Sequence, residues 1–91
     1  MLNELFQIIE ERKANPSEKS YTASLFAEGE DRICQKVGEE AVEVIIAAKG
    51  QGDQRIVEEV SDLFYHTLVL LSAKGLSLSD VEEELRKRHK K

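Results

Sequence analysis

Apolar residues recur along this chain at the three- and four-residue intervals of an α-helix. Near the start, Leu2, Leu5, Phe6 and Ile9 share one face of a helix predicted over residues 2–13. No stretch alternates between apolar and polar residues in the way that marks a half-buried strand. The pattern therefore predicts an all-α protein.

Turn-forming residues divide this helical pattern into separate elements. Proline removes a backbone donor and restricts the residue before it, so the first helix ends near Pro16 and residues 15–21 form a polar loop. Gly29 stops a short helix, and residues 50–53 (GQGD) supply turn and N-cap chemistry between the two longest helices. The expected helices cover residues 2–13, 22–28, 30–49, 53–74 and 79–89, with Ser77 or Ser79 capping the last.

Both long helices carry charged residues along the edge of an apolar face. At 100° per residue, Glu40 lies at the edge of the apolar arc of residues 30–49, with Lys36 and Glu43 beside it. In residues 53–74, the charged stripe beside a wider apolar arc consists of Glu59, Asp62 and His66. The arc of the first helix, which we expect to be buried, contains Ile33, Cys34, Val37, Ala41, Val44, Ile45 and Ala48.

The connection over residues 50–53 is too short for any arrangement except an antiparallel helical hairpin. In such a hairpin, residues that are equally distant from the midpoint near Gln51 lie at equal height. The matched pairs are Glu43 with Glu59, Glu40 with Asp62 and, further from the turn, Lys36 with His66. The hairpin is therefore predicted to stack two carboxylate pairs at matched levels.

Four carboxylates that converge in this way repel one another unless a cation compensates them. Mg²⁺, or Mn²⁺ in its place, prefers oxygen ligands, whereas zinc is disfavoured because no set of cysteines and histidines accompanies the acids. Glu40, Glu43, Glu59 and Asp62 are the predicted metal ligands, and Glu39 is a candidate outer ligand or base. The alternative is a solvated acidic surface without a metal, because Glu-x-x-Glu spacing is common on exposed helix faces.

Composition narrows the classes of protein to which the chain can belong. Its 91 residues are 41% hydrophobic and 34% charged, which predicts one globular domain over residues 1–91. The net charge of −5 argues against general nucleic-acid binding, and we find neither an apolar run that could span a membrane nor a signal peptide. Cys34 has no internal disulfide partner and is expected to be a small core residue, so a reduced, cytoplasmic setting is favoured.

Two segments resemble a known family of enzymes. "SYTASLFAEGEDRICQKVGEEAVE" (residues 20–43) and "EEVSDLFYH" (residues 58–66) are similar to phosphoribosyl-ATP pyrophosphatases, which belong to the all-α, MazG-like nucleotide pyrophosphohydrolases. The resemblance covers nearly the whole chain. It implies Mg²⁺-dependent hydrolysis of phosphoribosyl-ATP to phosphoribosyl-AMP and pyrophosphate, the second step of histidine biosynthesis. The short chain with one cysteine resembles the stand-alone form of this enzyme rather than a fusion with a cyclohydrolase.

Carried over by position, the resemblance assigns metal binding to the four acids and makes Glu39 and Glu40 the catalytic candidates. The candidate substrate-binding residues, which offer cations and hydroxyls to phosphate or ribose, are Lys19, Ser20, Tyr21, Arg32 and Lys36. For Lys36 and Arg32, the alternative is an ordinary salt bridge on the protein surface.

Some apolar residues remain that one short chain cannot cover. Val42 and Ile46 point away from the main apolar arc of their helix, and residues 53–74 are apolar over more than half of the helix circumference. We therefore expect at least a homodimer, in which two hairpins pack as a four-helix bundle with short flanking helices. Besides the enzyme implied by the resemblance, two alternatives are a related pyrophosphatase acting on (d)NTPs and a non-enzymatic acidic helical dimerisation module.

Overall fold

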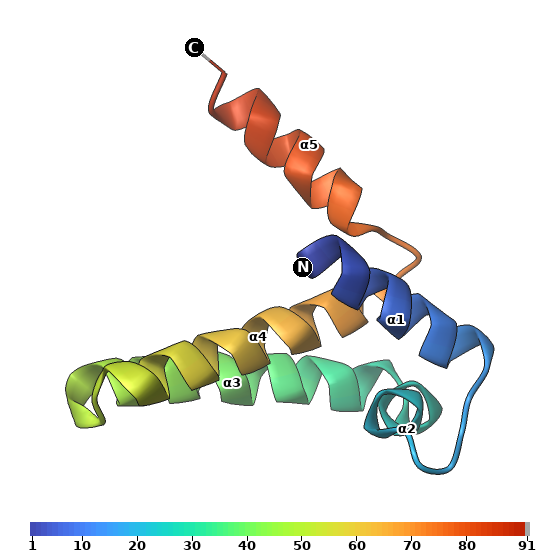
Figure 1. Cartoon of the computed structure of the whole chain (residues 1–91), viewed down its shortest axis with the longest axis horizontal. Coiled ribbons are helices and arrows are strands. Elements are labelled where there is room, and N and C mark those ends of the chain that lie inside the picture. The colour runs from blue at the N-terminus through green and yellow to red at the C-terminus, as the bar shows by residue number, and fades with distance from the viewer. Residues whose placement is uncertain (91) are drawn as a thin grey trace.

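Five α-helices make up the part of the chain that this computed structural model describes, residues 1–90 (Figure 1). They are α1 (Leu2–Ala14), α2 (Tyr21–Glu28), α3 (Glu30–Gly50), α4 (Asp53–Ala73) and α5 (Leu78–Arg88). No residue in this range forms a β-strand, so the all-α prediction is confirmed, and each predicted helix end is within one residue of the observed one. Among these helices, none combines the length with the apolar character that a membrane crossing requires.

Capping side chains explain where two of the shorter helices begin. The Ser20 hydroxyl accepts a hydrogen bond from the Ala23 amide at 3.0 Å, so α2 begins at Tyr21, one residue earlier than predicted. Ser77 and Asp80 form reciprocal side-chain and backbone hydrogen bonds at the start of α5. This capping box identifies Ser77 as the cap of the last helix.

α3 and α4 form the predicted antiparallel hairpin and lie side by side in Figure 1. The turn between them depends on Gly52, whose φ of 91° lies in the left-handed region that favours glycine. The acidic stripes of the two helices meet across this hairpin, since carboxylate oxygens of Glu40 on α3 lie close to those of Glu59 and Asp62 on α4.

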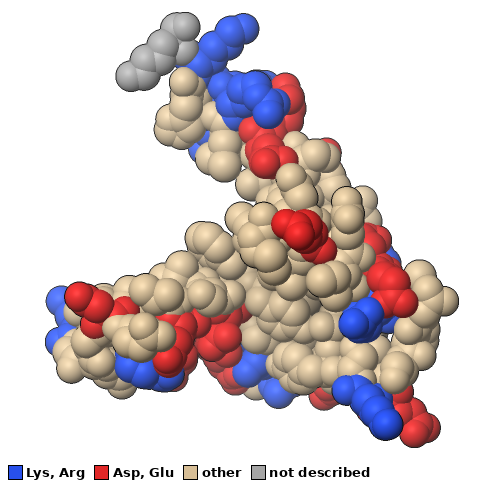
Figure 2. All heavy atoms as spheres, viewed as in Figure 1, with Lys and Arg blue, Asp and Glu red and all other residues tan. Residues whose placement is uncertain are grey.

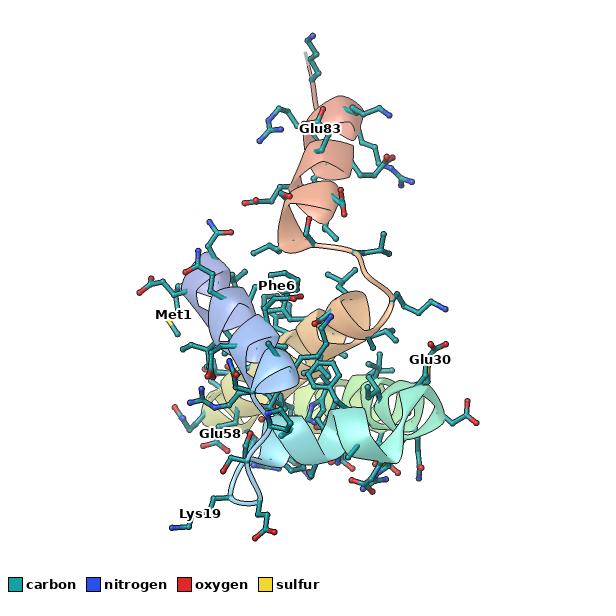
Figure 3. All side chains as sticks on the ribbon, turned by 90° about the vertical axis from the view of Figure 1, so that its right-hand side faces the viewer. Met1, Phe6, Lys19, Glu30, Glu58 and Glu83 are labelled. Carbon is teal, nitrogen blue, oxygen red and sulfur yellow. The ribbon has the colours of Figure 1, made fainter. Side chains whose placement is uncertain are left out.

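The buried core lies at the end of the hairpin remote from its turn (Figure 1). There α1 packs on α4, and α2 packs on both α3 and α1. The core residues are Ile9, Leu25, Ile33, Leu68 and Val69. Figure 3 shows Phe6 pointing from α1 toward this region, where it packs against the core, whereas α5 projects away from the body of the molecule.

The apolar arc of α3 that we expected to be buried is only partly covered within one chain. Ile33 is buried at the core, but Cys34 and Ile45 are exposed, so the prediction that Cys34 is a core residue is wrong for the single chain. The reason is the side on which α4 packs. α4 covers the part of α3 that contains Glu40 and the fully buried Ala47, and it leaves open the edge of the arc farthest from Glu40, where Cys34 and Ile45 lie.

Leu25 provides a test of where the core lies, because it is fully buried. We expect Leu25→Ala to lower the free energy of unfolding by about 2–5 kcal/mol, through lost burial and the cavity left behind. Urea unfolding followed by circular dichroism measures this change. Ile8→Ala on α1, where 46% of the residue is exposed, is the matched control and should cost less than about 1 kcal/mol. Equal losses from the two variants would contradict the assigned core.

Candidate active site

The α3–α4 hairpin brings three of the predicted acids together. Glu40, Glu59 and Asp62 each place one carboxylate oxygen within 4.8 Å of the other two. The Glu59 side chain is only 7% exposed and that of Glu40 12%, whereas Asp62 is open to solvent. Figure 2 shows acidic side chains gathered along one edge of the hairpin, beside basic ones. We name Glu40, Glu59 and Asp62 the acidic cluster.

The acidic cluster fits a small divalent cation. All three donors are carboxylate oxygens, which Mg²⁺ and Mn²⁺ favour. In an octahedral shell with bonds of about 2.1 Å, oxygens on opposite sides of the ion lie about 4.2 Å apart. The 4.8 Å spread of the cluster reaches that spacing by small side-chain rotations. The open side at Asp62 leaves room for waters or phosphate oxygens, which Mg²⁺ retains in its coordination shell.

Burial raises the pKa of Glu59, and the carboxylates of Glu40, Asp62 and Glu43 raise it further. Arg55 acts in the opposite direction, because its Nη2 atom lies 3.2 Å from Glu59 Oε1. The sequence analysis missed this arginine. Its position four residues before Glu59 on the same helix is the spacing that could have revealed it.

Lys36 lies beside Glu40 of the acidic cluster, whereas Arg55 lies beside Glu59. Its Nζ atom is 3.4 Å from Glu40 Oε1 and 3.5 Å from Glu39 Oε1. Burial lowers the pKa of Lys36, but the hydrogen bond to Glu40 and the nearby Tyr21, Glu40 and Glu39 groups outweigh burial and raise it. Two cations, Lys36 and Arg55, thus flank the cluster and compensate part of its negative charge.

Two further predicted acids lie beside the acidic cluster. Glu43 is half-buried and its charge acts on Glu59, although it does not belong to the group of three closest oxygens, so its metal-binding role stays a prediction. Glu39 is about half exposed, accepts a hydrogen bond from Gln35 at 3.0 Å and pairs with Lys36. Glu39 therefore lies at the rim of the site.

The predicted substrate-binding residues are placed at different distances from the acidic cluster. Tyr21 begins α2 and acts electrostatically on Lys36. Arg32 lies 3.8 Å from Glu28 in a surface ion pair, and the Ser20 hydroxyl caps α2. Lys19 is exposed in the α1–α2 loop, and Figure 3 shows it pointing away from the helices. Of this set, Lys36 is the residue that pairs with an acid of the cluster, Glu40.

A second contact that the sequence did not reveal joins α2 to α4. The Tyr21 hydroxyl lies 3.1 Å from the Nε2 atom of His66, which is buried beside the acidic cluster. The two residues are 45 positions apart, so no helix-spacing rule relates them. Their contact arises from the packing of α2 against the end of the hairpin.

The raised pKa of Glu59 predicts how the metal-free protein responds to pH. A folded-state pKa above the unfolded value means that the fold favours the protonated form of Glu59 over the ionised form. The stability associated with the protonated form is therefore fully present below the unfolded pKa and is lost as pH rises through the folded pKa. We therefore expect Glu59→Gln to raise the midpoint of thermal unfolding near pH 7 in EDTA, and to change it little near pH 3, where the carboxyl is protonated in both states.

Glu58→Gln is the matched control for this measurement. Hydrogen bonds from Gln54 and Arg55 lower the pKa of Glu58, so its ionised form is favoured in the fold and the amide should not stabilise the protein near pH 7. A lower unfolding midpoint for Glu59→Gln than for the unsubstituted protein near pH 7 would contradict the electrostatic account of the site.

Known proteins resemble this chain over its whole length. A family model described as Phosphoribosyl-ATP pyrophosphohydrolase matches residues 2–89. A phosphoribosyl-ATP pyrophosphatase of Clostridium acetobutylicum is 50% identical over 91 residues, which make up 100% of this chain and 83% of that protein. A phosphoribosyl-ATP pyrophosphatase of Geotalea daltonii is 52% identical over 88 residues, which make up 97% of this chain and 83% of that protein. The histidine biosynthesis bifunctional protein HisIE of Caldanaerobacter subterraneus subsp. tengcongensis is 53% identical over 91 residues, 100% of this chain and 44% of that protein.

Proposed function

The chain belongs to the phosphoribosyl-ATP pyrophosphohydrolase family, and from this premise we propose that the acidic cluster of the α3–α4 hairpin is its active site and binds Mg²⁺. The protein is a hydrolase of histidine biosynthesis that converts phosphoribosyl-ATP to phosphoribosyl-AMP and pyrophosphate. The observation that supports the location of the site is the convergence of three carboxylates from two helices, one of them buried.

The proposed roles follow from the position of each group. Glu40, Glu59 and Asp62, with Glu43 beside them, would hold Mg²⁺ or Mn²⁺. The chemistry that such an ion supplies when bound is charge neutralisation at the phosphate oxygens and activation of an attacking water. Glu39 at the rim orients that water as an outer ligand or base.

The cationic groups around the site bind the triphosphate part of the substrate. Lys36 contacts a phosphate as a point charge, because its ammonium already lies at the Glu40 end of the cluster. Tyr21 begins the helix next to it. Arg32 lies in the first turn of α3, and Lys19 and Ser20 lie in the loop between α1 and α2. These three residues contact more distant parts of the substrate.

We also propose that the enzyme is a cytoplasmic homodimer. On each helix, the apolar arc lies next to the acidic stripe, on the side of increasing rotation about the helix axis. Because α3 and α4 are antiparallel and their acidic stripes meet, the two apolar arcs lie on the same side of the hairpin. That side exposes large apolar residues, among them Ile45, Val57 and Phe64. A second copy packed on this face would complete a four-helix bundle and bury them.

A pyrophosphate-release assay tests the function directly. The purified protein is given phosphoribosyl-ATP, and separately ATP, dCTP and dUTP, each with Mg²⁺ or with EDTA. We expect Mg²⁺-dependent release that strongly prefers phosphoribosyl-ATP. A preference for dCTP or dUTP would instead indicate a related (d)NTP pyrophosphatase. Absence of release from every substrate, together with no Mg²⁺ binding, would favour a non-enzymatic acidic helical module.

A further inference from the structure

A single guanidinium group joins the nearly buried acid of the acidic cluster to the surface of α4. Arg55, in the first turn of α4, places its Nη1 atom 2.7 Å from Glu58 Oε1 and its Nη2 atom 3.2 Å from Glu59 Oε1. The Glu58 side chain is 44% exposed, whereas that of Glu59 is 7% exposed. Arg55 therefore bridges one carboxylate in solvent and one carboxylate of the acidic cluster.

The two carboxylates differ in how much they need the arginine. An ion pair between exposed residues on one helix is worth little, because water already solvates both charges, and this applies to Glu58. The Glu59 carboxylate has lost most of its water, and carboxylate oxygens of Glu40 and Asp62 lie within 4.8 Å of it. In the metal-free protein, Arg55 thus supplies positive charge to Glu59, as Lys36 does to Glu40.

A divalent ion and Arg55 require the same carboxylate. An ion held by the acidic cluster binds Glu59, and it then lies next to a guanidinium that contacts this side chain. Like charges at such short range repel each other, and the ion carries twice the charge of the arginine. Arg55 has a second partner outside the cluster, because Glu58 already holds its Nη1 atom at the shorter distance. Its side chain is 47% exposed, which leaves room for it to turn away from Glu59.

We infer that Arg55 is an exchangeable counter-cation of the metal site, which pairs with Glu59 in the metal-free protein and withdraws to Glu58 when Mg²⁺ binds. This inference rests on the proposed function, in which the acidic cluster binds Mg²⁺. The exchange stabilises the converging carboxylates before the metal arrives. It also weakens Mg²⁺ binding, because the ion has to displace a cation. Arg55 thereby raises the Mg²⁺ concentration at which the site is filled.

Isothermal titration calorimetry with Mg²⁺ tests the exchange without any assay of activity. We expect Arg55→Gln to bind Mg²⁺ about three- to tenfold more tightly than the unsubstituted protein, since a half-exposed charge pair is worth up to about fivefold in an equilibrium and the ion carries two charges. Unchanged affinity would overturn the inference. Weaker binding by Arg55→Gln would also overturn it, because that result is expected of an arginine that orients a metal ligand and does not compete with the metal.

Lys49→Gln is the matched control for this titration. Lys49 is exposed in the last turn of α3, at the same end of the hairpin as Arg55, so its substitution removes the same charge from the same region. Because solvent and salt screen an exposed charge, we expect Lys49→Gln to change the Mg²⁺ affinity by less than about twofold. An equal gain from the two variants would indicate a general effect of net charge and would overturn the inference.

A double-mutant cycle tests whether Glu58 receives the arginine. Glu58→Gln removes the second partner and leaves Arg55 on Glu59, so this change should weaken Mg²⁺ binding more when Arg55 is present than in the Arg55→Gln background. Equal losses in the two backgrounds would overturn the exchange, because they would show that Glu58 contributes only its own charge.

The proposed function and the role of Arg55 fail separately. If the unsubstituted protein binds Mg²⁺ but releases no pyrophosphate from phosphoribosyl-ATP, the proposed function fails, and the Mg²⁺ affinity of Arg55→Gln still decides the role of the arginine. If the unsubstituted protein is active and Arg55→Gln binds Mg²⁺ no more tightly, the function stands and the counter-cation role is wrong. A protein that binds no Mg²⁺ contradicts both.

Discussion

Glu40→Gln is expected to lower kcat/KM for phosphoribosyl-ATP by about a thousandfold or more. Glu40 is the one member of the acidic cluster that comes from α3, so it joins that helix to both Glu59 and Asp62 on α4. The amide keeps the shape of the side chain but removes the negative charge. A neutral oxygen is a weak ligand for Mg²⁺, and the Lys36 ammonium loses its partner at 3.4 Å.

The measurement is steady-state pyrophosphate release across a Mg²⁺ titration, with circular dichroism to establish that the fold is kept. Glu30→Gln is the matched control, because Glu30 lies on the same helix, carries the same charge and forms an exposed pair with Lys74 at 3.2 Å. We expect that control to retain activity within about threefold. Turnover by Glu40→Gln close to that of Glu30→Gln would rule out the acidic cluster as the active site.

The hairpin was predictable because its signals are local. Helical periodicity, Gly29 and the GQGD turn determine which residues form α3 and α4 and make them antiparallel. Once the turn is known, counting residues from Gln51 places Glu40 opposite Asp62 and Glu43 opposite Glu59. The acidic cluster is a consequence of that register. This is why three of the four predicted metal ligands are found together in the structure.

Other features depend on packing between segments that are distant in sequence. The contact between Tyr21 and His66 requires α2 to lie against the end of the hairpin, and no spacing rule within one helix predicts that. The exposure of Cys34 has a similar cause. Periodicity identified an apolar arc on α3, but the side on which α4 packs decides how much of the arc a single chain covers.

An apolar face left uncovered along the whole hairpin favours association of two copies. On α3, Ile45 is 60% exposed, and on α4, Val57 is 59% and Phe64 49% exposed. An apolar hollow of about 550 Å³ continues this face toward α5, and is lined by Leu63, Phe64, Leu68, Leu71, Leu78, Val81 and Leu85, among others. Exposing this much apolar surface to water costs free energy. Two copies related by a two-fold axis through this face would bury the apolar surface of both copies at once.

Phe64→Asp is therefore expected to convert the homodimer to monomers and to raise its dissociation constant by about a thousandfold or more. A two-fold interface contains each position twice, so the substitution buries two unpaired carboxylates per dimer. Sedimentation velocity over a concentration series measures the change. Gln54→Asp is the matched control, because Gln54 is exposed in the first turn of the same helix, where an acidic residue is tolerated. A dimer that survives Phe64→Asp, or an unsubstituted protein that sediments as a monomer at micromolar concentration, would contradict this assignment of the interface.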